Sequence, residues 1–247
     1  MTSLDILGCR LDTLDTDAAT DAIAKLARLG HGAQVVTLGT EMVVYAQRDP
    51  RFRDIINRCA LSLCDTVGLL TVARQRGARL SDRVTGVELV EHLCARAARD
   101  SIRVFLLGSA PGVAEQAAQV LRERYPGLQI GGVRDGYFRA DETAAVVEAI
   151  RASGTELLMV GLGSPRQEFW LSENLAATGA GVGVGIGGSL DVIAGKVERA
   201  PQAWRRLGLE WLYRLKKEPH RWRRQLALPQ FVWLIALDSL RPKRSTT

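Results

Sequence analysis

The sequence lacks the long apolar runs of membrane-spanning proteins. Its 247 residues contain no run of about 18 apolar residues, the length that a membrane-spanning helix requires. The first residues include Asp5 and lack the basic-then-apolar pattern of a secretory signal. These two features lead us to expect a cytoplasmic protein.

Cysteine and histidine are few and scattered. The four cysteines form no Cys-x-x-Cys pair, and the three histidines lie far apart in the sequence. This distribution predicts reduced, buried thiols, no structural zinc and no other bound metal or cofactor. The residues concerned are Cys9, Cys59, Cys64, Cys94, His31, His92 and His220.

Acidic residues are scarce in the last fifth of the chain. From Arg199 onward there are 12 Lys and Arg but 3 Asp and Glu, which is a net charge of +9. The whole chain carries +6, so the first 198 residues carry −3. A mildly acidic body with a strongly basic tail predicts an anionic partner for the tail.

Short apolar runs alternate with helical patterns through most of the sequence. This alternation predicts an α/β fold, with a mostly parallel, Rossmann-like sheet and helices on both faces. The length fits one α/β catalytic domain, residues 1–195, and a basic amphipathic appendage, residues 196–247. Ligands of such sheets bind beyond the carboxyl ends of the strands. The residues expected there are Thr37, Asp65, Gly108, Asp135, Gly163, Gln167, Gly187 and Asp191.

The stretch Leu157–Trp170 lies at the centre of this pattern. Leu157–Leu162 is long enough for a buried strand and too short for a helix. Ser164 suits the N-cap of a following helix, Pro165 its first position and Gln167 a capping box.

Two interpretations of this helix start remain open. The exposed N–H groups and partial positive charge of a helix N-terminus suit a phosphate, and Arg166, Gln167 and Glu168 cluster there. Alternatively, Gln167 only caps the helix and Arg166 is solvated.

Two further caps are predicted from short polar side chains. Thr16 or Asp17 is expected to cap a helix that runs to Leu29, and Asp141 to cap the helix Thr143–Ala152.

The stretch Gly183–Gly188 fits the pattern Gly-x-Gly-x-x-Gly. A dinucleotide-binding fingerprint should open a βαβ unit and precede an acidic residue by about 20 positions. Here the pattern occupies the last strand and the basic tail follows. The small residues therefore indicate close approach to a ligand or a neighbouring helix, and an oxidoreductase is not expected.

Asp65 and Arg83 each allow a catalytic and a structural interpretation. Asp65 leaves a buried strand at the ligand edge, where it could act as a general base on a hydroxyl or as a helix N-cap. Arg83 follows a basic loop and could bind phosphate or remain solvated.

The tail carries two apolar segments among basic residues. Trp204–Lys217 has a helical apolar stripe, and Pro219 interrupts it. The apolar stretch Leu226–Leu237 is expected to break at Pro229 and Gln230, so it is unsuited to crossing a bilayer. It could lie in a membrane interface, or pack on the body or on a second subunit.

A series of motifs occurs in order along nearly the whole chain. The motifs are Thr37 with Glu41-Met42-Val43, Asp65 with Gly68, Arg83-Val84-Thr85-Gly86, Leu106-Leu107-Gly108, Asp135-Gly136-Tyr137-Phe138, Val160–Trp170, Gly187-Gly188-Ser189-Leu190-Asp191, Arg199-Ala200-Pro201, Trp204, Gly208–Leu215 and Glu218-Pro219. With this series the chain resembles the WecG/TagA/CpsF family of bacterial glycosyltransferases.

The resemblance implies an inverting, metal-independent enzyme. It would move a sugar such as N-acetylmannosamine from a UDP-sugar to a polyprenyl-diphosphate-linked sugar at the cytoplasmic membrane face. The products would serve cell-surface polysaccharide or teichoic acid synthesis. The chain would be peripheral to the membrane, and a homo-oligomer is compatible with the sequence. This interpretation involves no nucleic acid.

The resemblance also assigns roles to individual residues. Asp65 would deprotonate the acceptor hydroxyl, Thr37 would help to place the substrates, and Arg83 would stabilise the leaving diphosphate. The expected nucleotide-sugar contacts are Gly108, Asp135, Gly136, Gly163, Arg166, Gln167, Glu168, Gly187, Gly188 and Asp191. The tail residues expected at the membrane or the acceptor diphosphate are Arg214, Arg221 and Arg224.

Two positions depart from the family's usual pattern. Gly39 stands where many members have Asn, and Thr66 where many have Gly. An Asn side chain at position 39 could touch the donor sugar, so its absence leaves the identity of the donor sugar undetermined. Two other functions also remain open: a soluble nucleotide-sugar hydrolase, and a non-enzymatic lipid- or nucleic-acid-binding module that uses the tryptophans and arginines of the tail.

Overall fold

The computed structural model describes residues 2–201, 204, 210–217 and 226–240. Within these residues one sheet of eight strands runs in the order β1-β2-β4-β3-β8-β7-β5-β6. β1 pairs antiparallel with β2, and the other neighbours pair parallel. The strands are β1 Ser3–Ile6, β2 Cys9–Asp12, β3 Ala33–Leu38, β4 Leu61–Cys64, β5 Val104–Gly108, β6 Ile130–Arg134, β7 Leu157–Gly161 and β8 Val182–Gly185.

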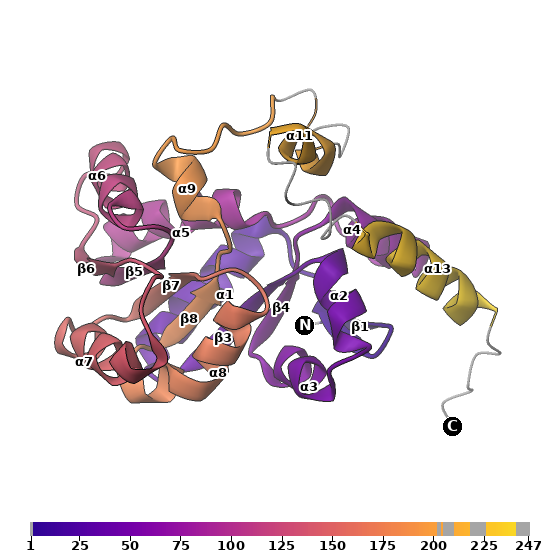
Figure 1. Ribbon diagram of the computed structural model, residues 1–247, viewed down its shortest axis with the longest axis horizontal. Coiled ribbons are helices and arrows are strands. Elements are labelled where there is room, and N and C mark those ends of the chain that lie inside the picture. Colours follow the sequence, from indigo (N-terminus) through magenta and orange to yellow (C-terminus); the bar gives the residue numbers. More distant parts are fainter. Residues whose placement is uncertain (1, 202–203, 205–209, 218–225, 241–247) are drawn as a thin grey trace.

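Helices cover both faces of this sheet, which confirms the predicted α/β architecture (Figure 1). One face packs against α1, α5, α6 and α9, and the other against α2, α3, α4, α7, α8 and α13. The helices are α1 Thr16–Leu29, α2 Thr40–Ala46, α3 Pro50–Arg58, α4 Val67–Gln75, α5 Gly86–Asp100, α6 Val113–Arg124, α7 Thr143–Ala152, α8 Arg166–Thr178, α9 Ser189–Ile193, α11 Glu210–Lys217 and α13 Ala227–Ser239.

The strand order reverses between β5 and β7. The chain leaves β5 outward to β6, whereas it leaves β7 inward to β8. The chain therefore continues from β5 to α6 on one face and from β7 to α8 on the other. In doubly wound sheets the expected ligand crevice lies at such a divergence, which here is the β5–β7 edge.

Two of the predicted caps are wrong. Asp15 caps α1, because its side chain accepts a hydrogen bond of 2.9 Å from the N–H of Ala18. A 3₁₀ turn over Ala140–Glu142 precedes α7, and the Glu142 carboxylate accepts from the N–H of Arg139 at 2.8 Å. Asp141 pairs instead with the Arg139 guanidinium. Several polar residues compete at each helix start, and local sequence does not decide between them.

The predicted break at Pro229 is also wrong, because α13 runs through it. Pro229 is the third residue of this helix, where a backbone N–H has no partner inside the helix, so proline costs no hydrogen bond there. α13 packs on α2 through Phe231, which is 3% exposed. Arg76 of α4 pairs with Asp238 at 2.7 Å and fixes the other end of the helix.

The four cysteines are free and buried, as predicted. Burial raises the pKa of Cys9, Cys59 and Cys64 to about 12, so these thiols stay protonated near neutral pH. Among the described helices none is both long and apolar enough to cross a membrane.

Candidate active site

Three of the residues predicted to be catalytic meet where β3 and β4 end. Thr37 lies opposite Leu63 in the β3–β4 pairing, and the N–H of Asp65 continues that pairing to the carbonyl of Leu38 at 3.0 Å. The N–H of Val84 bonds the carbonyl of Cys64 at 2.6 Å, which brings the loop carrying Arg83 alongside.

Cys64 lies near charges of both signs. Burial is the main cause of its raised pKa, after which the charges of Asp65 and Asp82 raise it and those of Arg83 and Arg74 lower it. Asp65 and Arg83 are each half-buried at the carboxyl edge. The N-cap residue of α4 is Thr66 rather than Asp65, so the N-cap interpretation of Asp65 is wrong.

Thr37 links this pair to the centre of the sheet. Its side chain is buried, and its hydroxyl donates a hydrogen bond of 2.9 Å to the carbonyl of Gly185 at the end of β8. The β3–β8 ladder ends at Val35 and Val184, so this bond holds the two strands together beyond their ladder.

At the crevice, Gly108 permits a contact that any other residue would block. A Cβ at this position would lie 2.4 Å from the carbonyl oxygen of Gly161, and φ is +143°. The close approach lets the N–H of Ser109 bond that carbonyl at 3.1 Å, and the carbonyl of Ser109 accepts from Gly136. The Ser109 hydroxyl also bonds the Asp191 carboxylate at 2.9 Å. The loops after β5, β6 and β8 are therefore tied together.

The predicted cap of α8 is wrong. The helix begins at Arg166, its N-cap residue is Pro165, and no side chain caps it. The Gln167 amide instead reaches β8: its oxygen accepts from the N–H of Gly187 at 3.0 Å, and its nitrogen donates to Glu168 Oε1 at 2.7 Å. A tertiary partner 20 residues away has replaced the local one.

Two other predicted contacts have partners in the loop after β6. The Arg166 guanidinium lies over the Phe138 ring, 5.1 Å from its centroid, and donates to the Phe138 carbonyl at 3.4 Å. The Asp135 carboxylate accepts from the N–H of Tyr137 at 2.8 Å and so shapes the turn after β6.

The two positions that depart from the usual pattern face one another. Gly39 has φ −107°, which any residue adopts, so backbone conformation does not require glycine there. A Cβ at Gly39 would lie 3.1 Å from Glu41 Oε2 and 3.5 Å from Thr66 Cγ2. The Thr66 hydroxyl oxygen is buried and has no hydrogen-bond partner within the described residues. Thr66 thus occupies space beside Asp65 that a larger residue at position 39 would need.

Sequence reasoning missed a cluster at the start of α5. The Arg199 guanidinium pairs with the Glu88 carboxylate at 2.6 Å, and Thr85 caps the helix and bonds Glu88 at 2.8 Å. Burial alone would raise the pKa of Glu88, but the hydrogen bond from Thr85 and the charge of Arg199 lower it. The spacing Thr-x-x-Glu is a capping-box signal that could have identified this cluster.

The tail residues are described in part. Arg221 and Arg224 lie outside the described residues, as does the side chain of Arg214 in α11. Among the described residues, no three His, Cys, Asp or Glu side chains lie close enough to hold a metal ion.

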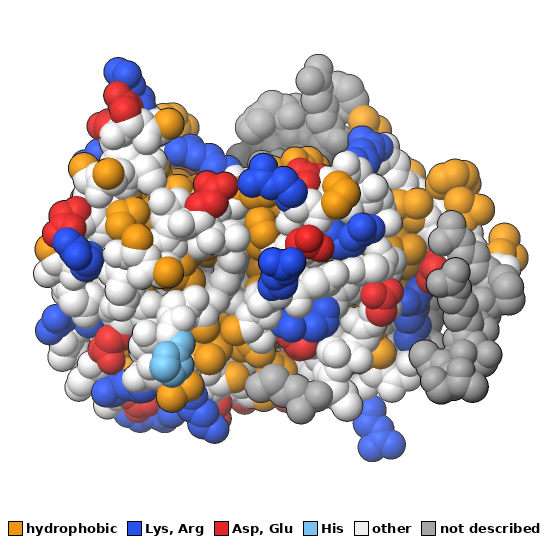
Figure 2. Space-filling view, turned by 90° about the horizontal axis from the view of Figure 1, so that it is seen from below, with side chains coloured by type: hydrophobic (Ala, Val, Ile, Leu, Met, Phe, Trp, Pro, Cys, Tyr) orange, Lys and Arg blue, Asp and Glu red, His pale blue; other side chains and the backbone are white. Residues whose placement is uncertain are grey.

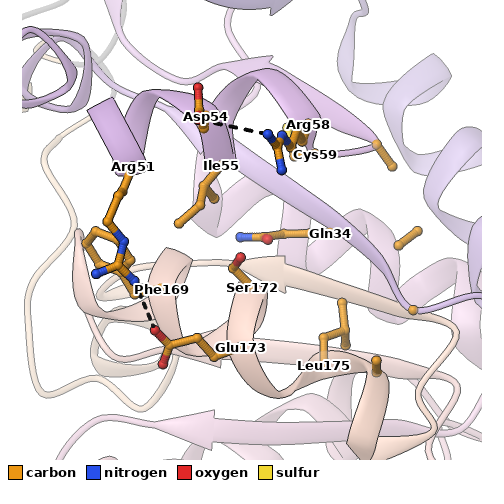
Figure 3. Close-up of a pocket in the computed structure, with 14 residues that line it drawn as sticks. Gln34, Arg51, Asp54, Ile55, Arg58, Cys59, Phe169, Ser172, Glu173 and Leu175 are labelled. Atoms are coloured by element: carbon orange, nitrogen blue, oxygen red, sulfur yellow. Dashed lines mark ion pairs between the residues drawn. The ribbon is translucent and has the colours of Figure 1, made fainter. Parts of the chain in front are cut away.

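A pocket of about 520 Å³ lies at the opposite end of the sheet, between α3 and α8 (Figure 3). Gln34 of β3 lies within it, Phe169 and Glu173 of α8 form one side, and Arg51 of α3 pairs with Glu173 at 3.7 Å. It contains none of the predicted site residues. We place the candidate site at the carboxyl edge, which carries the carboxylate of Asp65, the guanidinium of Arg83 and the β5–β7 loops.

Comparison with known proteins shows the family of this chain. The family model for the glycosyl transferase WecG/TagA/CpsF family matches residues 4–245. The chain is also 35% identical over 201 residues to the N-acetylglucosaminyldiphosphoundecaprenol N-acetyl-beta-D-mannosaminyltransferase of Bacillus spizizenii. That alignment covers 81% of this chain and 77% of the relative. The chain therefore belongs to the WecG/TagA/CpsF family of glycosyl transferases.

Proposed function

We propose that this glycosyltransferase moves N-acetylmannosamine or a related hexose from a UDP-sugar to a polyprenyl-diphosphate-linked sugar, with inversion and without a metal. The observation that carries the proposal is that the Cys64 carbonyl and the Val84 N–H join the segments of Asp65 and Arg83 at the carboxyl edge, on the same edge as the β5–β7 loops. The printed name of the Bacillus relative supports the choice of sugar and acceptor.

In this proposal the reaction is a single displacement. The Asp65 carboxylate removes the proton of the acceptor hydroxyl, and that oxygen attacks the anomeric carbon of the donor sugar. The bond from this carbon to the diphosphate breaks as the new bond forms on the opposite side, so the configuration inverts. The leaving UDP takes the electron pair, and the Arg83 guanidinium stabilises its charge.

The crevice is the proposed donor site. The loops that carry Gly108, Gly136, Gly163, Gly187 and Asp191 line this part of the edge, and the bonds among Ser109, Gly136 and Asp191 fix their relative positions. The N-termini of α4 and α8 open on the same edge and add partial positive charge for the diphosphate. Arg166, Asp135, Gly188 and the Gln167–Glu168 pair complete the proposed set.

Facing Gly39, Thr66 is the proposed determinant of donor choice. Its hydroxyl lies next to Asp65 and has no partner in the described part of the chain. A substrate hydroxyl or acetamido group could satisfy it. In this arrangement the contact to the donor sugar comes from Thr66, just before α4. In the family's usual pattern it would come from the Asn at position 39.

The appendage is the proposed membrane contact at the cytoplasmic face. α13 leaves large apolar side chains exposed after it has docked on α2, and these gather at one end of the molecule (Figure 2). Arg214, Arg221 and Arg224 would add attraction to anionic headgroups or to the acceptor diphosphate. The lipid-linked acceptor would then meet the site at the membrane surface, in the synthesis of a cell-surface polysaccharide or teichoic acid.

A panel of UDP-sugars with a short-chain polyprenyl-diphosphate-linked N-acetylglucosamine acceptor tests the proposal. We expect acceptor-dependent release of UDP with UDP-N-acetylmannosamine or a close relative, and a disaccharide product of inverted anomeric configuration. Donor hydrolysis that is indifferent to the acceptor would identify a hydrolase instead. Salt-dependent oligonucleotide binding without turnover would indicate a binding module.

A further inference from the structure

Glu168 is an acidic residue in an unusual position. It lies in the first turn of α8 and is 1% exposed. Its Oε1 accepts from the Gln167 amide, whereas its Oε2 is buried and has no hydrogen-bond partner within the described residues. A buried carboxyl without a full set of partners is costly, so its place in the proposed donor site calls for a role.

The surrounding strands leave room for the Gln167–Glu168 pair. A Cβ at Gly185 of β8 would lie 2.7 Å from Gln167 Nε2 and 3.3 Å from Glu168 Oε1. On the β3 side, Gln34 donates to the backbone carbonyl of Glu168 at 3.0 Å. The glycine of β8 is therefore what allows α8 to turn these two side chains into the sheet edge.

Gln167 has one permitted orientation in this arrangement. Its amide nitrogen faces Glu168 Oε1, and its amide oxygen faces the N–H of Gly187. A flipped amide would set its nitrogen against the N–H of Gly187 and lose both bonds. Glu168 thus selects the orientation that holds the Gly187 turn, from which α9 and Asp191 follow.

We propose that Glu168 is a positioning residue of the donor site, which acts through Gln167 to fix the Gly187 turn. This inference rests on the proposed function, because it assumes that the turn borders the nucleotide-sugar. Glu168 itself is enclosed and touches Gln167 rather than the substrate.

The surroundings of Glu168 favour the uncharged acid. Burial raises the pKa of Glu168 above its ordinary value and the charge of Glu41 on α2 adds to this, while hydrogen bonds from Gln167 and Ser164 partly offset it. Arg51 of α3 is directed to Phe169 and Glu173 instead. β3 presents Gln34 and Thr37 nearby, and β8 presents glycine, so these strands bring no compensating charge.

Because the pKa is raised, Glu168 keeps its proton to a higher pH than an ordinary glutamate does. Ionisation would place a charge beside the Gln167 amide in a buried position. We expect kcat/KM for the UDP-sugar to fall as pH rises through the pKa of this group.

Glu168→Gln and Glu168→Ala in the full-length protein test the proposal. The amide oxygen of Glu168→Gln still accepts from Gln167, so we expect its donor KM to lie closer to wild type than that of Glu168→Ala. Glu168→Ala leaves the Gln167 amide nitrogen unpaired, and we expect the donor KM to rise about tenfold with a smaller change in kcat. Glu173→Gln, an exposed glutamate of the same helix, is the matched control and should change neither.

Two results would overturn the positioning role. One is a folded Glu168→Gln variant that loses as much activity as Glu168→Ala, since the carboxylate itself would then be needed. The other is a Glu168→Ala variant whose donor KM equals that of the wild type. Failure of the wild-type protein to transfer sugar from any UDP donor would contradict the proposed function instead. In that case Glu168 is tested by the pH dependence of unfolding, which needs no substrate.

Discussion

Trp233 of α13 is expected to anchor the proposed membrane contact. It is 64% exposed although the helix is docked, and Val232, Leu237 and Leu240 are exposed beside it. Exposed tryptophan and leucine on one surface helix are typical of an interfacial segment. We therefore expect Trp233→Ala to weaken binding to lipid vesicles while the body stays folded.

The exposed fraction sets the size of the effect. A tryptophan offers about 250 Å² for burial, so 64% exposure leaves roughly 160 Å² available to the lipid. At about 25 cal/mol per Å² full transfer would contribute about 4 kcal/mol. An interfacial helix buries one side, so we take about half of this, which is about 2 kcal/mol or a thirtyfold change in the partition coefficient.

Vesicle co-sedimentation at low and high salt measures this change. Because apolar burial is insensitive to screening, the loss for Trp233→Ala should persist at high salt. Leu29→Ala is the matched control: Leu29 is 58% exposed but ends α1, which packs on the other face of the sheet from α13. Sedimentation of Trp233→Ala equal to wild type, or an equal loss for Leu29→Ala, would refute the reasoning.

The remaining predictions concern the base, the leaving group, the tail and the buried acid. Asp65→Asn keeps the shape but takes no proton, so turnover should fall at least about a hundredfold with folding intact; near-normal transfer would remove Asp65 from the mechanism. Transfer should persist in excess EDTA, and loss that Mg²⁺ or Mn²⁺ restores would contradict the arginine-based account of the leaving group. Reversal of Arg214, Arg221 and Arg224 to Glu should release the protein from anionic vesicles at low salt while calorimetric UDP-sugar binding survives; equal loss of donor binding would place the tail over the nucleotide. In chemical denaturation the free energy of unfolding of Glu168→Gln should rise relative to wild type as pH rises above 4.5, the ordinary pKa of glutamate. The reason is that folded Glu168 keeps a proton that the unfolded chain loses. The difference in free energy of unfolding should grow by up to about 1.4 kcal/mol per pH unit until the folded-state pKa is reached. Parallel pH profiles of the two proteins would rule out a buried neutral acid.

Strand positions were readable from the sequence because buried parallel strands are short apolar runs. The apolar run Leu157–Leu162 predicts a strand, and the observed β7 ends one residue earlier, at Gly161. The interpretation of the glycines in Gly183–Gly188 as close approach is also confirmed, because a Cβ at Gly183 would lie 2.5 Å from Leu171 of α8. Periodicity and residue size are local properties of the sequence, so they predict an element without knowledge of its tertiary partners.

Hydrogen-bond partners that lie far apart in the sequence could not be predicted in this way. Ser109 and Asp191 are 82 residues apart, and Gln167 and Gly187 are 20 apart. The capping rule for Gln167 describes an isolated helix start, whereas in the fold the β8 turn offers its amide a better partner. The burial of Glu168 has the same cause, since a glutamate in the first turn of a helix is ordinarily solvated.

The docking of α13 connects the proposed membrane contact to the proposed base. Phe231 packs toward Gly68 of α4, where a Cβ would lie 3.8 Å from its ring and 2.8 Å from the Thr40 methyl. Gly68 is three residues after Asp65, at the end of α4 that opens on the site. One helix layer thus separates an exposed apolar surface from the carboxylate. A lipid-linked sugar needs this arrangement, because its chain stays in the bilayer while its hydroxyl reaches the base. The body could bind the donor without α13, but the acceptor would then have to leave the membrane to react.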